Sequence, residues 1–209
     1  MNVLIADDHV VVRRGLRDIL ADEFSELHVR EVCNGQEALE AVRRQTWDVV
    51  LLDIKMPGRG GLEVLEELKK LQPTTPVVVI SAFPEQEYAV RAFRLGAAAY
   101  VSKEGASDEL LAAVRKALSG GRYVTPALAE KLAAALSSEA PTSPHEGLSN
   151  RELEVLRLIA AGKTLKEVAA ELHLSENTIA TYRARISQKL GLNTNVEIAR
   201  YAVRHQLVD

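Results

Sequence analysis

Five polar residues stand where short apolar runs end, and their types together suit a divalent cation and a phosphoryl group. Asp7 and Asp8 follow the first run, in VLIADDH, and Asp53 follows the third, in DVVLLD. Ser81 follows the fourth run and Lys103 follows the fifth. The carboxyl ends of parallel strands open onto one edge of a sheet. We therefore expect these side chains to converge into an acidic pocket that contains one lysine.

Three carboxylates and one backbone carbonyl form the predicted metal site. Mg²⁺ prefers oxygen ligands, keeps several waters and bridges to phosphate oxygens. We assign Asp8 and Asp53 as side-chain ligands, and Asp7 as the group that orients a metal-bound water. The backbone carbonyl of Lys55, on the loop that follows Asp53, completes the shell. Mg²⁺ is therefore the cofactor that the sequence predicts.

The same pocket predicts covalent chemistry with phosphorus. A carboxylate attacks a phosphoryl group only when the negative charge on both reactants is neutralised, which the cation does. Asp53 is the expected nucleophile and phosphoacceptor, forming an acyl phosphate. Lys103 is expected to neutralise a second phosphoryl oxygen, and the Ser81 hydroxyl to donate to a third.

A sheet must bring these strand ends together, and residues 1–120 have the matching pattern. Short β-branched runs alternate with amphipathic stretches, which predicts a doubly wound α/β domain with five parallel strands buried on both faces. The expected strands are Val3–Ala6, His28–Val32, Val49–Leu52, Val77–Ile80 and Ala99–Val101. The expected helices are Val11–Ala21, Gln36–Arg44, Leu62–Leu71, Gln86–Leu95 and Asp108–Leu118.

Residues 121–147 are predicted to form a linker, and residues 148–209 a small all-α domain of four helices. Thr125-Pro126 begins a helix near 126–137, and the polar segment SSEAPTSPHEG follows it. In the tail, a capping box at Ser149 precedes the first helix. A short helix, a tight turn and the longer helix Asn177–Leu190 then match a helix-turn-helix. A last helix, Asn195–His205, offers more apolar residues than one small core needs.

The long tail helix has two faces. Ile179, Tyr182, Ile186 and Leu190 share an apolar stripe that should pack on the preceding helices. The opposite face suits the major groove of DNA, where Arg reads guanine and Asn or Gln reads adenine. The expected base-reading residues are Asn177, Thr181, Ala184, Arg185 and Gln188. The expected phosphate contacts are Lys163, Lys166, Thr178, Arg183 and Lys189.

Composition limits the function classes. The chain has 209 residues, net charge −3, and no apolar run long enough to span a membrane. Residues 148–209 contain nine Lys or Arg and seven acids, so the tail has charge +2 and the remainder −5. From the start MNVLIADD we expect no basic, cleavable leader, and the one cysteine cannot form an internal disulfide. We expect a cytoplasmic protein with no membrane partner, in which Cys33 is small and partly buried.

These motifs resemble a known family. IADDH, LLDIKMPG, VISA and AYVSK resemble the receiver domain of bacterial two-component response regulators, which is flavodoxin-like. The tail LSNRELEVLRLIAAGKTLKEVAAELHLSENTIATYRARISQKLGL resembles the LuxR-type helix-turn-helix. Together the halves are similar to the NarL/FixJ family, and the tail is most similar to the subgroup of BvgA and GacA.

The resemblance implies a phosphorylation-activated transcription regulator. A cognate sensor histidine kinase would phosphorylate Asp53, and the receiver would promote only its own phosphorylation and dephosphorylation, without being an enzyme. Ser81 and Tyr100 would form the switch, which remodels the surface around Gln86–Leu95 and the fifth strand. The phosphorylated chain would form a homodimer on double-stranded promoter DNA, with part of the last helix in the dimer contact. Many relatives have lysine at the position of Ala180, so base reading through that lysine does not transfer.

Alternatives stay open at this stage. A Mg²⁺-dependent, phosphatase-like hydrolase could use Asp53 in the same way, although Lys55 replaces the second carboxylate of a DxD pattern. A phosphate-independent regulator is the third interpretation. The unphosphorylated receiver either occludes the DNA-binding helix or fails to dimerise.

We also hypothesise that Lys55 and Phe83, two residues past Asp53 and Ser81, influence how long the acyl phosphate lasts.

Overall fold

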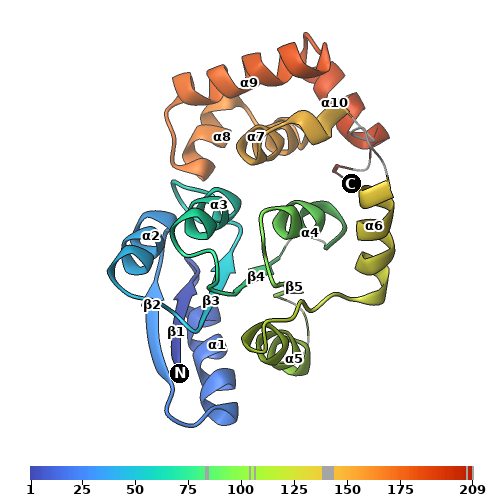
Figure 1. Cartoon of the computed structure of the whole chain (residues 1–209). Helices are drawn as coiled ribbons and strands as arrows, with labels where there is room; N and C mark the ends of the chain where they lie inside the picture. Colours follow the sequence, from blue (N-terminus) through green and yellow to red (C-terminus); the bar gives the residue numbers. More distant parts are fainter. Residues whose placement is uncertain (83–84, 104, 106, 138–143, 206, 209) are drawn as a thin grey trace. The chain divides into compact units, whose positions relative to one another are not determined.

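A computed structural model describes residues 1–82, 85–103, 105, 107–137, 144–205 and 207–208 (Figure 1). Internal contacts divide the chain into two compact units, Met1–Ala134 and Ala135–Asp209. None of the described helices is both long and apolar enough to cross a membrane.

Five parallel strands form the centre of the first unit, as the sequence predicts. Their order is β2-β1-β3-β4-β5, which is a doubly wound topology with the reversal between β1 and β3. The strands are β1 (Asn2–Ala6), β2 (His28–Val32), β3 (Val49–Asp53), β4 (Val77–Ser81) and β5 (Ala99–Ser102). Asp53 and Ser81 are therefore the last residues of their strands, where the predicted strands end one residue earlier.

Helices cover both faces of this sheet (Figure 1). Leu4 and the other residues of its face pack against α2, α3 and α4, whereas Val3 and the residues of the opposite face pack against α1 and α5. This alternation follows from the two-residue period of a strand. The helices are α1 (Val10–Glu23), α2 (Gly35–Arg44), α3 (Gly61–Leu71), α4 (Glu85–Arg94) and α5 (Ser107–Leu118).

Strand β2 corrects the expectation that all five strands are buried on both faces. Only Val32 in this strand is buried, and His28 is exposed. β2 is an edge strand that pairs with β1 alone, and unlike the other edge strand, β5, it consists mostly of polar residues, HVREV. Cys33, which directly follows β2, is exposed, so the prediction of a partly buried thiol is wrong.

Helix α6 (Pro126–Ser137) begins at proline, as predicted, and its first turns pack on the first unit. Leu128 is 2% exposed and belongs to the same apolar cluster as Tyr88, Phe93 and Tyr100. The start of the segment expected as a linker is therefore anchored to the α4–β5 side of the sheet.

The second unit is helical, with a core of its own. Its elements are η1 (Pro144–Gly147), α7 (Asn150–Ala160), α8 (Leu165–Leu172), α9 (Glu176–Leu190) and α10 (Asn195–Arg204). Capping boxes begin α7, α8 and α10, the first of them at Ser149 as predicted. Ser175 caps α9 and Gly191 ends it with a positive φ of 68°. The predicted apolar stripe is confirmed, because Ile179 and Ile186 are buried in this core.

Candidate functional site

Asp53 is held at the carboxyl end of β3 by close packing around its backbone. The side chain is 1% exposed. The first residue of α3, Gly61, donates its backbone N–H to the Ile54 carbonyl at 2.8 Å. A Cβ on Gly61 would overlap the carbonyl oxygen of Asp53, so only glycine permits this approach. Gly61 is not among the site residues predicted from the sequence.

One lysine joins two buried carboxylates in this pocket. Lys103 Nζ donates to Asp53 Oδ2 at 2.7 Å. The same ammonium lies 2.7 Å from Oδ2 of Asp7, a residue that is also 1% exposed. This second ion pair is not a hydrogen bond, and Asp7 Oδ2 has no hydrogen-bond partner among the described residues. Residues at the carboxyl ends of β1, β3 and β5 thus converge, as the sequence predicts.

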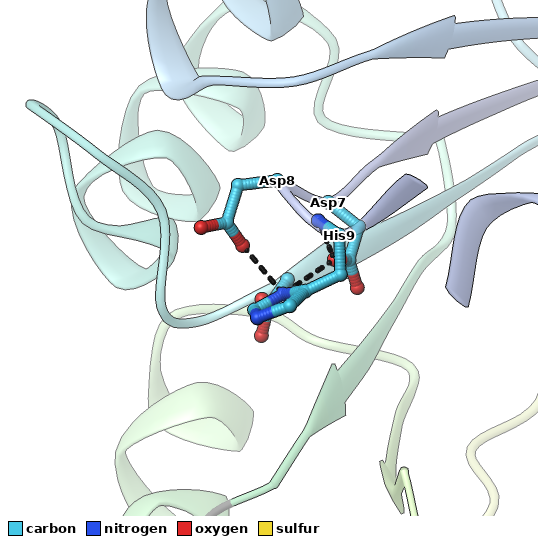
Figure 2. A group of neighbouring side chains, drawn as sticks. Asp7, Asp8 and His9 are labelled. Atoms are coloured by element: carbon cyan, nitrogen blue, oxygen red, sulfur yellow. Dashed lines mark hydrogen bonds and ion pairs between the residues drawn. The ribbon is translucent and has the colours of Figure 1, made fainter. Parts of the chain in front are cut away.

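Asp8 and His9 extend the cluster towards solvent. His9 Nδ1 lies 3.2 Å from Asp7 Oδ1 and 2.8 Å from Asp8 Oδ1, so its ring bridges the two carboxylates (Figure 2). The His9 backbone N–H also donates to Asp7 Oδ1 at 2.8 Å. His9 is not among the site residues predicted from the sequence, although its place directly after two aspartates was the available signal.

Burial and the neighbouring lysine oppose each other at Asp53. Desolvation raises the pKa of Asp53 to about 6, although the hydrogen bond and charge of Lys103 lower it, and the charge of Asp7 raises it further. Burial alone would lower the pKa of Lys103, but its hydrogen bond to Asp53 and the negative charges of Asp53 and Asp7 raise it above its ordinary value. The ammonium therefore stays charged while the carboxylates compete for it.

The donor set fits a hard divalent cation. Asp7, Asp8, His9 and Asp53 each place a ligand atom within 4.8 Å of those of the other three. Three carboxylates face one ammonium, which leaves negative charge uncompensated, and Asp7 Oδ2 is a buried acceptor without a hydrogen bond. Carboxylate oxygens and retained waters are the ligands that Mg²⁺ prefers. The residues present therefore fit Mg²⁺.

Of the remaining predicted pocket residues, those that the structure describes lie on β4, on β5 and in the loop that follows β3. Ser81 is fully buried at the end of β4, where its carbonyl accepts the Lys103 backbone N–H at 2.8 Å. The Lys55 backbone N–H donates to Asp53 Oδ1 at 3.2 Å, which places the loop after β3 against the carboxylate. Tyr100 is 2% exposed, so its side chain already lies inside the unit. Phe83 lies outside the described residues.

The α8–α9 pair forms the predicted helix-turn-helix. The turn between the helices begins at His173, which adopts a left-handed conformation with φ 53°. On α9 the expected base-reading residues are all exposed, and they are Asn177, Thr181, Ala184, Arg185 and Gln188. Thr181 Oγ1 donates to the Asn177 carbonyl at 2.9 Å, which leaves its methyl group for apolar contact.

Three of the predicted phosphate contacts have partners inside the second unit. Lys189 Nζ donates to the buried Glu152 at 2.7 Å and to the Gly147 carbonyl at 3.2 Å. Arg183 donates to Asn195 Oδ1 at 2.8 Å, and Lys163 pairs with Glu171. Lys166 is exposed and Thr178 is half-buried.

Two family models match the chain. The model of the response regulator receiver domain matches residues 3–115. The model described as bacterial regulatory proteins, LuxR family, matches residues 146–202.

Curated relatives and solved structures agree with both matches. The chain is 39% identical over 212 residues to response regulator GacA of Pseudomonas aeruginosa, covering 100% of this chain and 98% of that one. It is 35% identical to response regulator UvrY of Escherichia coli, covering 99% and 95%. RcsB from Salmonella enterica serovar Typhimurium, bound to promoter rprA with the phosphomimetic BeF3⁻, superposes with TM-score 0.64, 27% identity and coverage of 96% and 98%. An RcsB–DNA complex gives TM-score 0.59 at 25% identity, covering 97% and 98%.

Proposed function

The chain belongs to the two-component response regulators that join a receiver domain to a LuxR-type DNA-binding domain, and we propose that phosphorylation of Asp53 controls its binding to promoter DNA. The observation that carries this assignment is the buried Asp53 carboxylate, held by Lys103 at 2.7 Å beside two further aspartates. Functionally, we assign residues 1–120 to the receiver, 121–147 to the connection and 148–209 to DNA binding.

Each pocket residue has a distinct task in the proposed transfer. A carboxylate oxygen of Asp53 attacks phosphorus, the bond to the donor breaks, and an acyl phosphate forms. Asp8, Asp53 and the Lys55 carbonyl would hold Mg²⁺, with Asp7 orienting a water, and the bound cation would supply charge neutralisation between the two anions. Lys103 and the Ser81 hydroxyl hold the other phosphoryl oxygens. The donor is a sensor histidine kinase, and the receiver promotes only its own phosphorylation and dephosphorylation.

The proposed switch lies where β5, α4 and α6 meet. A divalent phosphoryl group makes contacts with Ser81 and Lys103 in only one of two states, so that state becomes dominant. Tyr100 and Leu128 belong to one apolar cluster, which supports a path from the pocket to α6. The inward Tyr100 has the orientation that we assign to the active state.

We assign DNA recognition to α9. We attribute tight binding to DNA to the formation of a homodimer. The exposed face of α9 reads bases, while Lys166 and Thr178 contact phosphates. A domain of charge +2 needs a second half-site for tight binding. Val196 and Val203 on α10 are 77% and 59% exposed, and we assign them to a homodimer contact. We infer a cytoplasmic location from the proposed binding to promoter DNA.

One experiment tests the central assignment. The full chain is incubated with a small phosphodonor and Mg²⁺, and its mass and promoter affinity are measured together with those of Asp53→Ala. We expect one phosphoryl group per wild-type chain, none on the variant, and tighter DNA binding only by the wild type. A phosphoryl mass on Asp53→Ala would refute the acceptor assignment. Repeated release of phosphate, many times per chain, would instead support a hydrolase.

A further inference from the structure

A cavity of about 370 Å³ lies at the opposite edge of the sheet from Asp53. Its walls come from the α3–β4 connection, the end of α4, the α4–β5 connection and the segment after α5. These segments lead into the amino ends of β4 and β5, whereas the acidic pocket is formed at carboxyl ends. A strand of five residues separates the two edges by roughly 16 Å. The cavity is therefore distinct from the phosphoryl-acceptor site.

The charges that line this cavity all have one sign. Lys69, Arg94 and Arg122 contribute to its wall, and no acidic residue does so among the described residues. Lys116 lies beside it, because its aliphatic chain passes over Gly121, another residue of the wall. Four cations thus gather in a portion of the chain whose net charge is negative.

Two of these cations, Lys69 and Arg122, repel each other. Burial, together with the positive charge of Arg122, lowers the pKa of Lys69. Lys69 Nζ donates to the Thr75 carbonyl at 2.6 Å and to the Pro73 carbonyl at 3.3 Å, which uses two of its three hydrogens. Arg122 has no ion-pair partner within the described part of the chain. A bound anion would remove this repulsion.

The rest of the wall limits the kind of anion. Pro76 and Leu95, with several alanines, provide apolar surface next to the cations. A volume of about 370 Å³ exceeds what one phosphate fills and lies within the usual range of ligand pockets. Arginine and lysine form strong, charge-assisted hydrogen bonds with phosphate oxygens, and the apolar wall suits a flat ring.

We propose that this cavity binds a nucleoside phosphate, with its phosphates against Arg122, Lys69 and Arg94 and its base against Pro76 and Leu95. The ligand class follows from the combination of positive charge and apolar wall. The site needs neither a divalent cation nor the acyl phosphate.

Calorimetric titration of the full chain tests the proposal. The buffer contains EDTA, which removes metal-dependent binding at Asp53, and the probes are ADP, pyrophosphate and adenosine. We expect ADP to bind once per chain, more tightly than either other probe, and more weakly as salt increases. Arg122→Gln should weaken ADP binding about tenfold, because it removes charge-assisted hydrogen bonds. Arg122 is exposed, so circular dichroism should show an unchanged fold.

Two control variants separate this cavity from other cations. Lys70→Gln removes an exposed cation that pairs with Glu66 outside the cavity, and Arg185→Gln removes one from α9. Neither should change the affinity for ADP. Equal ADP affinity in Arg122→Gln and wild type, or loss of binding in Arg185→Gln, would overturn the site. Equal affinities for ADP and pyrophosphate would overturn the role of the apolar wall.

Discussion

Asp53 must satisfy two opposing demands. A nucleophile should be ionised and accessible to phosphorus, yet the fold buries this carboxylate to 1% exposure. Burial raises its pKa to about 6, and Lys103 prevents a larger rise. The carboxylate is therefore mostly ionised at neutral pH, but its charge lowers the stability of the folded protein when no cation is bound. A cation at the pocket would relieve that cost.

The stability contribution of Asp53 should depend on pH. Its folded-state pKa is raised from 3.8 to about 6, so the folded chain holds the proton more tightly than the unfolded chain. Stability from this group is then fully present below pH 4 and is lost as pH rises through about 6. Without divalent cations, Asp53→Asn should exceed wild type in unfolding free energy by at most about 3 kcal/mol at pH 7.5. Urea unfolding at several pH values measures the difference, and a gap that does not grow with pH would contradict this account.

Gly61 and Gly15 form a matched pair for a second test. Alanine at Gly61 would collide with the Asp53 backbone, so Gly61→Ala should destabilise the chain by about 1–3 kcal/mol and reduce phosphorylation. Gly15 lies within α1, and a Cβ there meets no atom within 4 Å. Gly15→Ala should therefore stabilise the chain by about 0.5–1 kcal/mol. Thermal melts and phosphoryl uptake of both variants provide the measurement, and equal effects would refute the close-approach argument.

At the scale of elements, α6 contributes to the stability of the first unit. Leu128→Ala removes a side chain that is 2% exposed, so it should cost about 2–5 kcal/mol in unfolding free energy. Leu71, on α3, is 43% exposed, and Leu71→Ala should change stability by less than about 1 kcal/mol. Urea unfolding compares the two variants. Similar small losses would mean that α6 does not pack on the receiver.

Lys189 links α9 to α7, and this gives it a role besides phosphate binding. Burial alone would raise the pKa of Glu152, but the hydrogen bonds from Lys189 and Ser149 hold it below its ordinary value. Lys189→Met leaves that buried carboxylate without its cation and should destabilise the second unit by about 1–2 kcal/mol. Lys166→Met should instead preserve stability and weaken DNA binding. A larger loss of stability in Lys166→Met than in Lys189→Met would reverse these assignments.

The sequence predicted the pocket because parallel topology alone brings strand ends together. To bring Asp7, Asp53 and Lys103 to one edge of the sheet, it was enough that their strands are parallel. The edge position of β2 and the exposure of Cys33 depend on strand order, which the local pattern of HVREV does not contain. Likewise, the pairing of Lys189 with Glu152 joins positions 37 residues apart, so no helical spacing could reveal it.

At the scale of the whole molecule, dimerisation should depend on exposed α10 residues. Val203→Asp introduces a charge at a side chain that is 59% exposed, so the monomer fold should persist. The same charge would be buried in a symmetric contact, where its desolvation should weaken dimerisation at least about tenfold. Sedimentation of the phosphorylated chain on DNA measures this, with Arg44→Asp on α2 as an exposed control. If Val203→Asp dimerises as tightly as the wild type, the dimer contact lies elsewhere.

Strand β4 has a thermodynamic consequence for signalling. It ends at Ser81 beside the phosphoryl-acceptor pocket, and Pro76, at the cavity wall, directly precedes its first residue. If a nucleotide binds the phosphorylated chain more tightly than the unmodified chain by some factor, linkage requires that it favour the phosphorylated form by the same factor. Cellular nucleotide levels would then adjust the sensitivity of the regulator to its kinase, without any ligand touching Asp53.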